Sequence, residues 1–172
     1  MTETTTLHPA SHLLNSLSFT LNYARALLTD VPEDQFAHLP MPGFNHPAFC
    51  YGHLACYPAR MLMFLGEAEQ ALELPFETKD YEHGAECVEQ DGRYAPMPVI
   101  VDAFFAGHER LVEVLPTVSP EVFARPTGLE GRMAELFPRV GDAIDFMSGN
   151  HMMLHLGQVS MWRRAMGMGS CM

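Results

Sequence analysis

The stretch "GNHMMLHLGQVSMWRRAMG", residues 149–167, decides how the rest of the chain is interpreted. It is rich in Met, Leu and Val, yet it carries His151 and His155 four residues apart. In a helix, residues at this spacing point the same way, with β-carbons about 5–6 Å apart. The pattern predicts a helix from about Gly141 to Met166, which ends at the glycine-rich "GMGS". This helix would present two imidazoles on one face.

Three further helices are predicted upstream of this one. Apolar residues recur at helical spacing in Pro9–Thr29 and again in Pro98–Leu115. Between these two, the second helix of the chain is expected to begin near Asn45 or His46 and to continue through "AFCYGHLACYPARMLMFLGEAEQAL", residues 48–72. Asn45 can cap this helix, and Pro47 suits its first turn. Pro58 should bend it, because proline removes a backbone hydrogen bond.

The fold class predicted from these segments is all-α, a four-helix bundle with a long crossover connection, forming a single domain over residues 1–172. The acidic stretch Glu67–Asp91 is interpreted as a solvated helix end and a surface loop. The stretch "PTVSPEVFARPTGLEGR", residues 116–132, is rich in turn-forming residues and is expected to be a loop.

Charge and composition exclude several classes of function. The formal net charge is −11, which argues against binding to nucleic acids and to anionic membranes. No apolar run approaches the roughly 20 residues that span a bilayer. The first basic residue is Arg25, so the start of the chain does not resemble a secretory leader. The four cysteines form no CxxC pair and are interpreted as reduced thiols of a cytoplasmic protein.

The histidine pair suggests a metal site, because neutral imidazole is a common metal ligand and two imidazoles on one apolar face are costly to bury in charged form. Two ligands are too few for a catalytic zinc site, which usually has three. His53, His46 and His108 are all candidates for the third ligand, and spacing alone leaves the choice open. The alternative is that these are hydrogen-bonded core histidines. A protease of the HExxH type is excluded, because Met152 stands where the glutamate is needed.

Three quoted stretches carry a resemblance to a known family. The chain has "GHLACY" in its second predicted helix, "HMMLHLGQVSMWRRAMG" in its fourth and "ALLTDVPEDQF" at the exit of its first. In these features it resembles the DinB/YfiT-like superfamily of four-helix proteins with a histidine triad. The resemblance implies that His53, His151 and His155 bind a divalent metal ion, zinc or nickel. His108 shares a helix face with Val101, Phe104, Leu111 and Leu115, so it is expected to lie in the core or to contact a ligand, and not to bind the metal itself.

Some members of this superfamily are metal-dependent transferases that use a low-molecular-weight thiol. The resemblance therefore implies a small electrophilic substrate, a thiol co-substrate and a homodimer. Gln158 is expected to orient the substrate or a metal-bound water, or else only to tie helices together. A metal-hydroxide hydrolase and a non-catalytic bundle, with structural metal or none, are the alternatives to the transferase.

Overall fold

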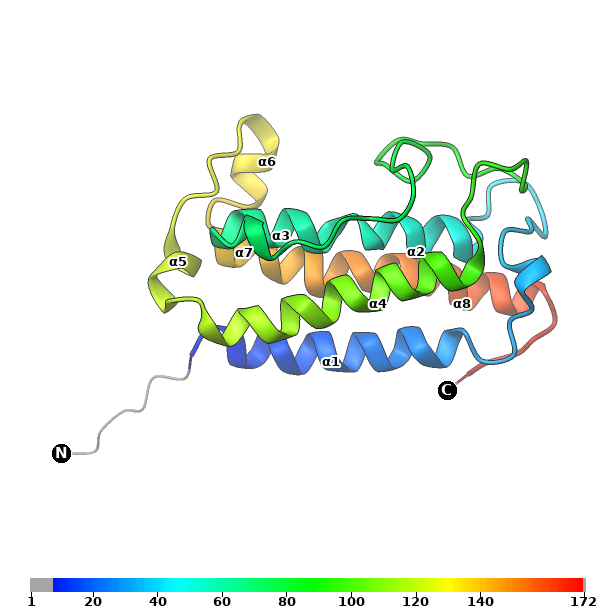
Figure 1. The fold of residues 1–172 in the computed structure, drawn as a ribbon, viewed down its shortest axis with the longest axis horizontal. Coiled ribbons are helices and arrows are strands. Elements are labelled where there is room, and N and C mark those ends of the chain that lie inside the picture. The colour runs from blue at the N-terminus through cyan, green and yellow to red at the C-terminus, as the bar shows by residue number, and fades with distance from the viewer. Residues whose placement is uncertain (1–7, 172) are drawn as a thin grey trace.

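The computed structural model describes residues 8–171, which form helices and contain no strand. The all-α prediction is therefore confirmed. The long helical segments lie side by side along the length of the molecule (Figure 1). They are α1 (Ala10–Leu27), α2 (Pro47–Ala55) continued by α3 (Tyr57–Leu65), α4 (Met97–Val114), and α7 (Val140–Asp145) continued through a π-helix (Phe146–Asn150) into α8 (His151–Ala165).

The order of these segments requires one long crossover. The α1 segment and the α7–α8 segment run in one direction, and α2–α3 and α4 both run in the other (Figure 1). Residues 66–96 therefore return along the bundle before α4 begins, as predicted. Shorter helices fill the connections: η1 (Glu33–Gln35), η2 (Ala68–Gln70), η3 (Leu115–Thr117), α5 (Pro120–Ala124) and α6 (Gly131–Leu136). The loop predicted for residues 116–132 was thus wrong in part, since it holds η3, α5 and the start of α6.

The second predicted helix differs from expectation at both ends. His46, not Asn45, is its N-cap residue, and the Nδ1 atom of His46 accepts a hydrogen bond from the backbone of Phe49 at 3.1 Å. The helix ends at Leu65 rather than near residue 72, because Gly66 adopts a left-handed conformation with φ of +84°. A bend was predicted at Pro58, and the structure shows a break close to it, since α2 stops at Ala55 and α3 starts two residues later.

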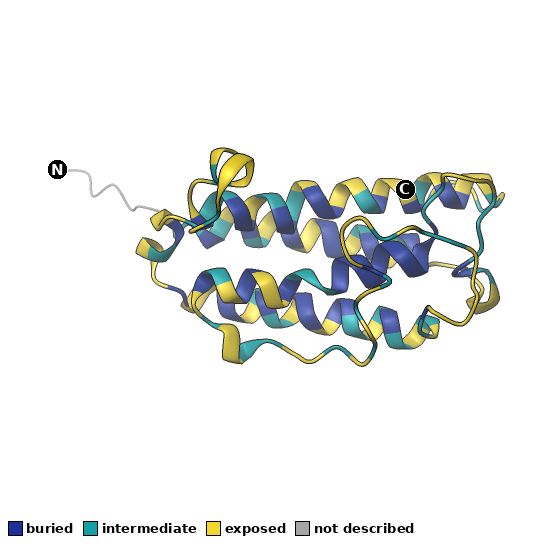
Figure 2. Cartoon of the chain, turned by 90° about the horizontal axis from the view of Figure 1, so that it is seen from above, coloured by how far each residue is buried: buried dark blue, intermediate teal, exposed yellow. Residues whose placement is uncertain are grey.

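The core lies between the long segments, whose inward faces are buried and outward faces exposed (Figure 2). The central element is α2, in which every residue is buried. It packs against both α4 and α8. Among the described residues, no helix is both long and apolar enough to cross a membrane. A helix buried all round, such as α2, holds its polar side chains in fixed surroundings.

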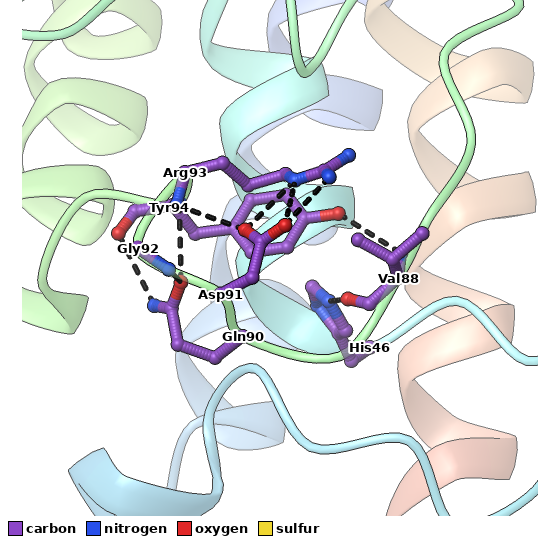
Figure 3. Close-up of polar contacts among 7 residues, drawn as sticks. All are labelled: His46, Val88, Gln90, Asp91, Gly92, Arg93 and Tyr94. Atoms are coloured by element: carbon purple, nitrogen blue, oxygen red, sulfur yellow. Dashed lines mark hydrogen bonds and ion pairs between the residues drawn. The ribbon is translucent and has the colours of Figure 1, made fainter.

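The crossover is attached to the start of α2 by the second ring nitrogen of His46. The Nε2 atom of His46 donates to the carbonyl of Val88 at 2.8 Å (Figure 3). The ring of His46 also meets the ring of Tyr94 edge-on, and the Tyr94 hydroxyl accepts a hydrogen bond from the backbone of Val88 at 3.1 Å. Both nitrogens of His46 therefore have protein partners, and its role is structural.

Candidate metal centre

Two segments supply the three histidines of the candidate site. His53 lies on α2, and His151 is the first residue of α8, directly after the π-helix Phe146–Asn150. His155 follows one turn later on α8. A π-helix leaves a wider turn than an α-helix and often marks a functional site. Here it immediately precedes the turn that carries two of the three imidazoles.

The three side chains meet at their Nε2 atoms. The Nε2 atom of His151 lies 3.2 Å from that of His53 and 3.2 Å from that of His155. One ring nitrogen from each residue lies within 4.8 Å of the others. The sequence left the third ligand open among His53, His46 and His108, and the structure brings His53 to the pair.

Hydrogen bonds on the far side of the rings fix which nitrogens carry protons. The Nδ1 atom of His53 donates to the carbonyl of Tyr81 at 2.6 Å, and that of His155 donates to Oε1 of Gln158 at 3.0 Å. A neutral imidazole has one N–H, so both residues present a lone pair at Nε2. His151 faces these lone pairs, while its buried Nδ1 has no partner among the described residues.

The surroundings keep all three imidazoles neutral. Burial, followed by the neighbouring His155 and His53, lowers the pKa of His151 to about 3. Burial and then His53 lower the pKa of His155 to about 4, and burial also lowers the pKa of His53. Protonation would place a positive charge in a poorly solvated cluster of like groups.

This donor set fits a divalent metal ion. Three Nε2 atoms converge, and at most the single N–H of His151 is available to hydrogen-bond to the other two. A cation that accepts one lone pair from each ring would satisfy all three atoms. Three imidazoles are a common ligand set for zinc and suit nickel as well.

The other two candidate histidines lie elsewhere. His46 is the cap of α2 described above. His108 is fully buried in the core on α4, where its Nδ1 donates to the carbonyl of Phe104 at 2.7 Å. Its ring packs against that of Phe104, with 4.5 Å between the ring centres.

Sequence reasoning missed the residue that holds His53, namely Tyr81. This residue lies within the acidic stretch interpreted as solvated surface, yet its side chain is fully buried. A β-carbon at Gly52 would lie 2.1 Å from the Tyr81 ring, so only glycine allows this approach. The interpretation of Glu67–Asp91 as solvated was therefore wrong at Tyr81, whereas the other residues of the stretch are exposed or partly exposed. The signal in the sequence was Gly52, directly before His53.

A cavity opens beside the histidine cluster. Its volume is about 430 Å³, and its wall includes His53 and the neighbouring side chains of Tyr57 and Arg60. The centre of the Tyr57 ring lies 4.3 Å from that of His151, and the Arg60 guanidinium lies over the same Tyr57 ring, 5.3 Å from its centre. A small molecule in this cavity would lie next to the candidate metal site.

Gln158 contacts the outer side of the cluster. Besides the His155 ring, its Oε1 accepts a hydrogen bond from Nδ2 of Asn45 at 3.0 Å. It therefore joins α8 to the segment before α2 and orients the ring of His155. It does not line the 430 Å³ cavity.

The fold and the site together define a helical protein with a three-histidine candidate metal centre. Comparison with family models identifies the family: the model of the DinB superfamily matches residues 16–159, and the chain belongs to that superfamily. The matched region contains all three histidines and Gln158. Searches of curated proteins and of solved structures returned no significant match.

Proposed function

We propose that the protein is a metal-dependent transferase that joins a low-molecular-weight thiol to a small electrophilic substrate. The observation that carries this proposal is the convergence of three neutral imidazole nitrogens, one of them from His53, which also lines the 430 Å³ cavity. A divalent ion held by His53, His151 and His155 would lower the pKa of a thiol that reaches it.

The chain's own residues supply position and environment. The Tyr81 carbonyl and the Gln158 side chain hold two of the rings, so the Nε2 atoms keep their direction without substrate. Such hydrogen bonds to the far nitrogen of a ligating imidazole orient it and raise its basicity. Direct action of Gln158 on the substrate stays a prediction, because its contacts lie on the outer side of His155.

The cavity contains a cysteine, but this residue is poorly suited to be the nucleophile. Burial raises the pKa of Cys56 to about 11, and its thiol donates to the carbonyl of Gly52 at 3.3 Å. At neutral pH it is protonated, and the thiolate is the reactive form. The reactive sulfur is therefore expected to come from a separate small thiol. In the reaction, a carbon–sulfur bond forms, the leaving group departs with its electron pair, and the thiol proton goes to solvent.

The proposal is tested by metal content and turnover. Protein purified without an affinity tag is analysed for zinc and nickel. It is then incubated with 1-chloro-2,4-dinitrobenzene and, in turn, cysteine, glutathione and coenzyme A. Thioether formation that depends on added metal, is lost in His151→Ala and is retained in Cys56→Ser would support the proposal. Metal-dependent ester hydrolysis without thioether formation would favour the hydrolase instead.

A further inference from the structure

Two cavities of different character share one wall next to the histidine cluster. The larger, of about 430 Å³, is lined by polar groups that include Arg60, Glu82 and His83. The smaller, of about 120 Å³, is lined mainly by apolar side chains, among them Phe137 and Phe146. Tyr57 and Arg60 line both cavities. Because the two cavities share these lining residues, a single small molecule could place a polar group in the larger cavity and an apolar group in the smaller one.

The Arg60 guanidinium has no carboxylate partner among residues 8–171, although the chain carries 21 acidic residues against 10 basic ones. It lies over the ring of Tyr57, at 5.3 Å from the ring centre. Stacking on an aromatic ring leaves the N–H groups at the edge of the guanidinium free to bind a carboxylate. Arg60 is exposed, and its charge lines the cavity without a counter-ion among the described residues.

The other charged groups of the larger cavity restrict the ligand further. Glu82 lines the same cavity and accepts a hydrogen bond from the Thr78 hydroxyl at 2.9 Å. Because its carboxylate would repel a second negative group, the cavity suits a ligand with one carboxylate better than a dianion. His83 adds a second imidazole, beside that of His53, to the lining of this cavity.

The smaller cavity is covered by the short helix α6. Met133 of α6 lines it together with Phe137 and Phe146, whose rings are tilted against each other with centres 4.7 Å apart. The ring of Phe146 is in turn 5.7 Å from that of His151. An apolar group bound there would lie close to His151 of the histidine cluster, in a cavity that Tyr57 and Arg60 also line.

We propose that the substrate is a monocarboxylate with an apolar group, bound with its carboxylate on Arg60 and its apolar group under α6, against Phe137 and Phe146. This rests on the proposed function, because it names the class of the electrophilic substrate. The two cavities and the unpaired Arg60 carry it.

The test uses 4-phenylbutanoate and its uncharged analogue 4-phenylbutanamide as probes, with binding measured by calorimetry. The carboxylate should bind more tightly than the amide. Arg60→Gln should weaken carboxylate binding about tenfold and remove the preference, since a charge-assisted hydrogen bond is lost. Arg60→Lys should retain part of the preference. Arg110→Gln, which removes an equal charge from the exposed face of α4, should change nothing.

The proposed binding of the apolar group under α6 is tested with Met133→Ser. Met133 is 49% exposed, so this change should leave the fold intact. It should weaken both probes alike and leave the preference for the carboxylate. Equal affinity of wild type for the two probes, unchanged affinity in Arg60→Gln, or no binding of either probe at millimolar concentration would each overturn the proposal.

Measuring metal content as well as probe binding distinguishes failure of this proposal from failure of the proposed function. Binding is measured on the protein as purified and again after treatment with EDTA, so that coordination of the probe to a metal is distinguished from its contact with Arg60. Zinc stoichiometry of Arg60→Gln should equal that of wild type. If the wild type binds no metal but prefers the carboxylate, only the transferase proposal fails. If it binds metal and shows no preference, only the substrate class fails.

Discussion

The ring of Tyr81 lies directly on the backbone of α2 at Gly52, where a β-carbon would stand 2.1 Å from Cδ1 of the ring. The next residue of α2 is His53, whose Nδ1 donates to the carbonyl of the same tyrosine at 2.6 Å. The Tyr81 hydroxyl also accepts a hydrogen bond from the backbone of Ala95 at 2.9 Å, just before α4. One residue of the crossover thus connects α2, the start of α4 and a ring of the candidate metal centre.

Replacing Gly52 should therefore disturb stability and the site together. In Gly52→Ala the added methyl must displace the Tyr81 ring, which is held between Phe76 and Tyr94. Overpacking of this kind costs about 1–3 kcal/mol. Because His53 loses its fixed partner, affinity for zinc should also fall. Urea unfolding and zinc titration measure the two effects.

Gly157→Ala is the matched control for this change. Gly157 is also a helical glycine, but a β-carbon there would meet nothing within 4 Å. The substitution should stabilise the protein by up to about 1 kcal/mol, because alanine favours helix over glycine. Equal effects of the two substitutions on stability would show that contact with Tyr81 does not restrict position 52 to glycine.

The three-histidine cluster should bind one divalent ion per chain. His151→Ala and His155→Ala should each abolish stoichiometric zinc binding, since each removes one of three converging nitrogens. Zinc should raise the melting temperature of wild type, because an ion that binds only the native state stabilises it. His46→Ala should lower stability but keep the metal. Retention of zinc with unchanged affinity in His53→Ala would refute this ligand set.

Arg163 should contribute strongly to stability through the end of α1. It is buried on α8, and its Nη1 donates to the carbonyls of Leu27 and Thr29 at 3.0 and 2.6 Å. Carbonyls at the end of a helix lack partners within that helix. Arg163→Met should cost about 2 kcal/mol in the free energy of unfolding, because these carbonyls lose their donor. Arg164→Met, on the exposed side of α8, should change it by less than about 0.5 kcal/mol. Similar losses in both variants would contradict this role.

The sequence predicted those parts of the molecule that depend on local periodicity. The long helices follow from apolar residues at helical spacing, and the shared direction of His151 and His155 follows from their separation of four. The choice of His53 did not follow from spacing, since His46 and His108 satisfied it equally. Resemblance to the DinB family selected it, and the structure brings it to the pair.

The remaining features depend on contacts between distant residues, and these leave little local signal. Tyr81 lies among acidic residues whose average character indicates exposed loop, and its burial depends on the absence of a side chain at Gly52. The second helix was predicted to continue beyond residue 65, because the Ala, Glu and Gln residues that follow favour helix. The left-handed conformation of Gly66 ends it instead. The π-helix before His151 likewise has no pattern of its own in the sequence.

The buried ring of His108 should make the protein less stable in acid. Burial lowers the pKa of His108 to about 4, whereas an unfolded histidine titrates at about 6.5. Between these values the unfolded state binds a proton that the folded state does not, so the free energy of unfolding falls as pH decreases. Between pH 7.5 and pH 5 this single group should account for about 2 kcal/mol.

The change that isolates this effect is His108→Asn. An asparagine amide can still donate to the Phe104 carbonyl but does not titrate. The variant should be less stable than wild type at pH 7.5, because it leaves a gap in the core. Its stability should nevertheless fall less steeply towards pH 5.

Urea unfolding of both proteins in EDTA removes any contribution from metal binding, and the other buried histidines contribute equally to both curves. Parallel curves would show that His108 does not titrate as a buried neutral group. Zinc stoichiometry at pH 7.5 should be the same in both proteins, since the His108 ring lies in the core and outside the histidine cluster.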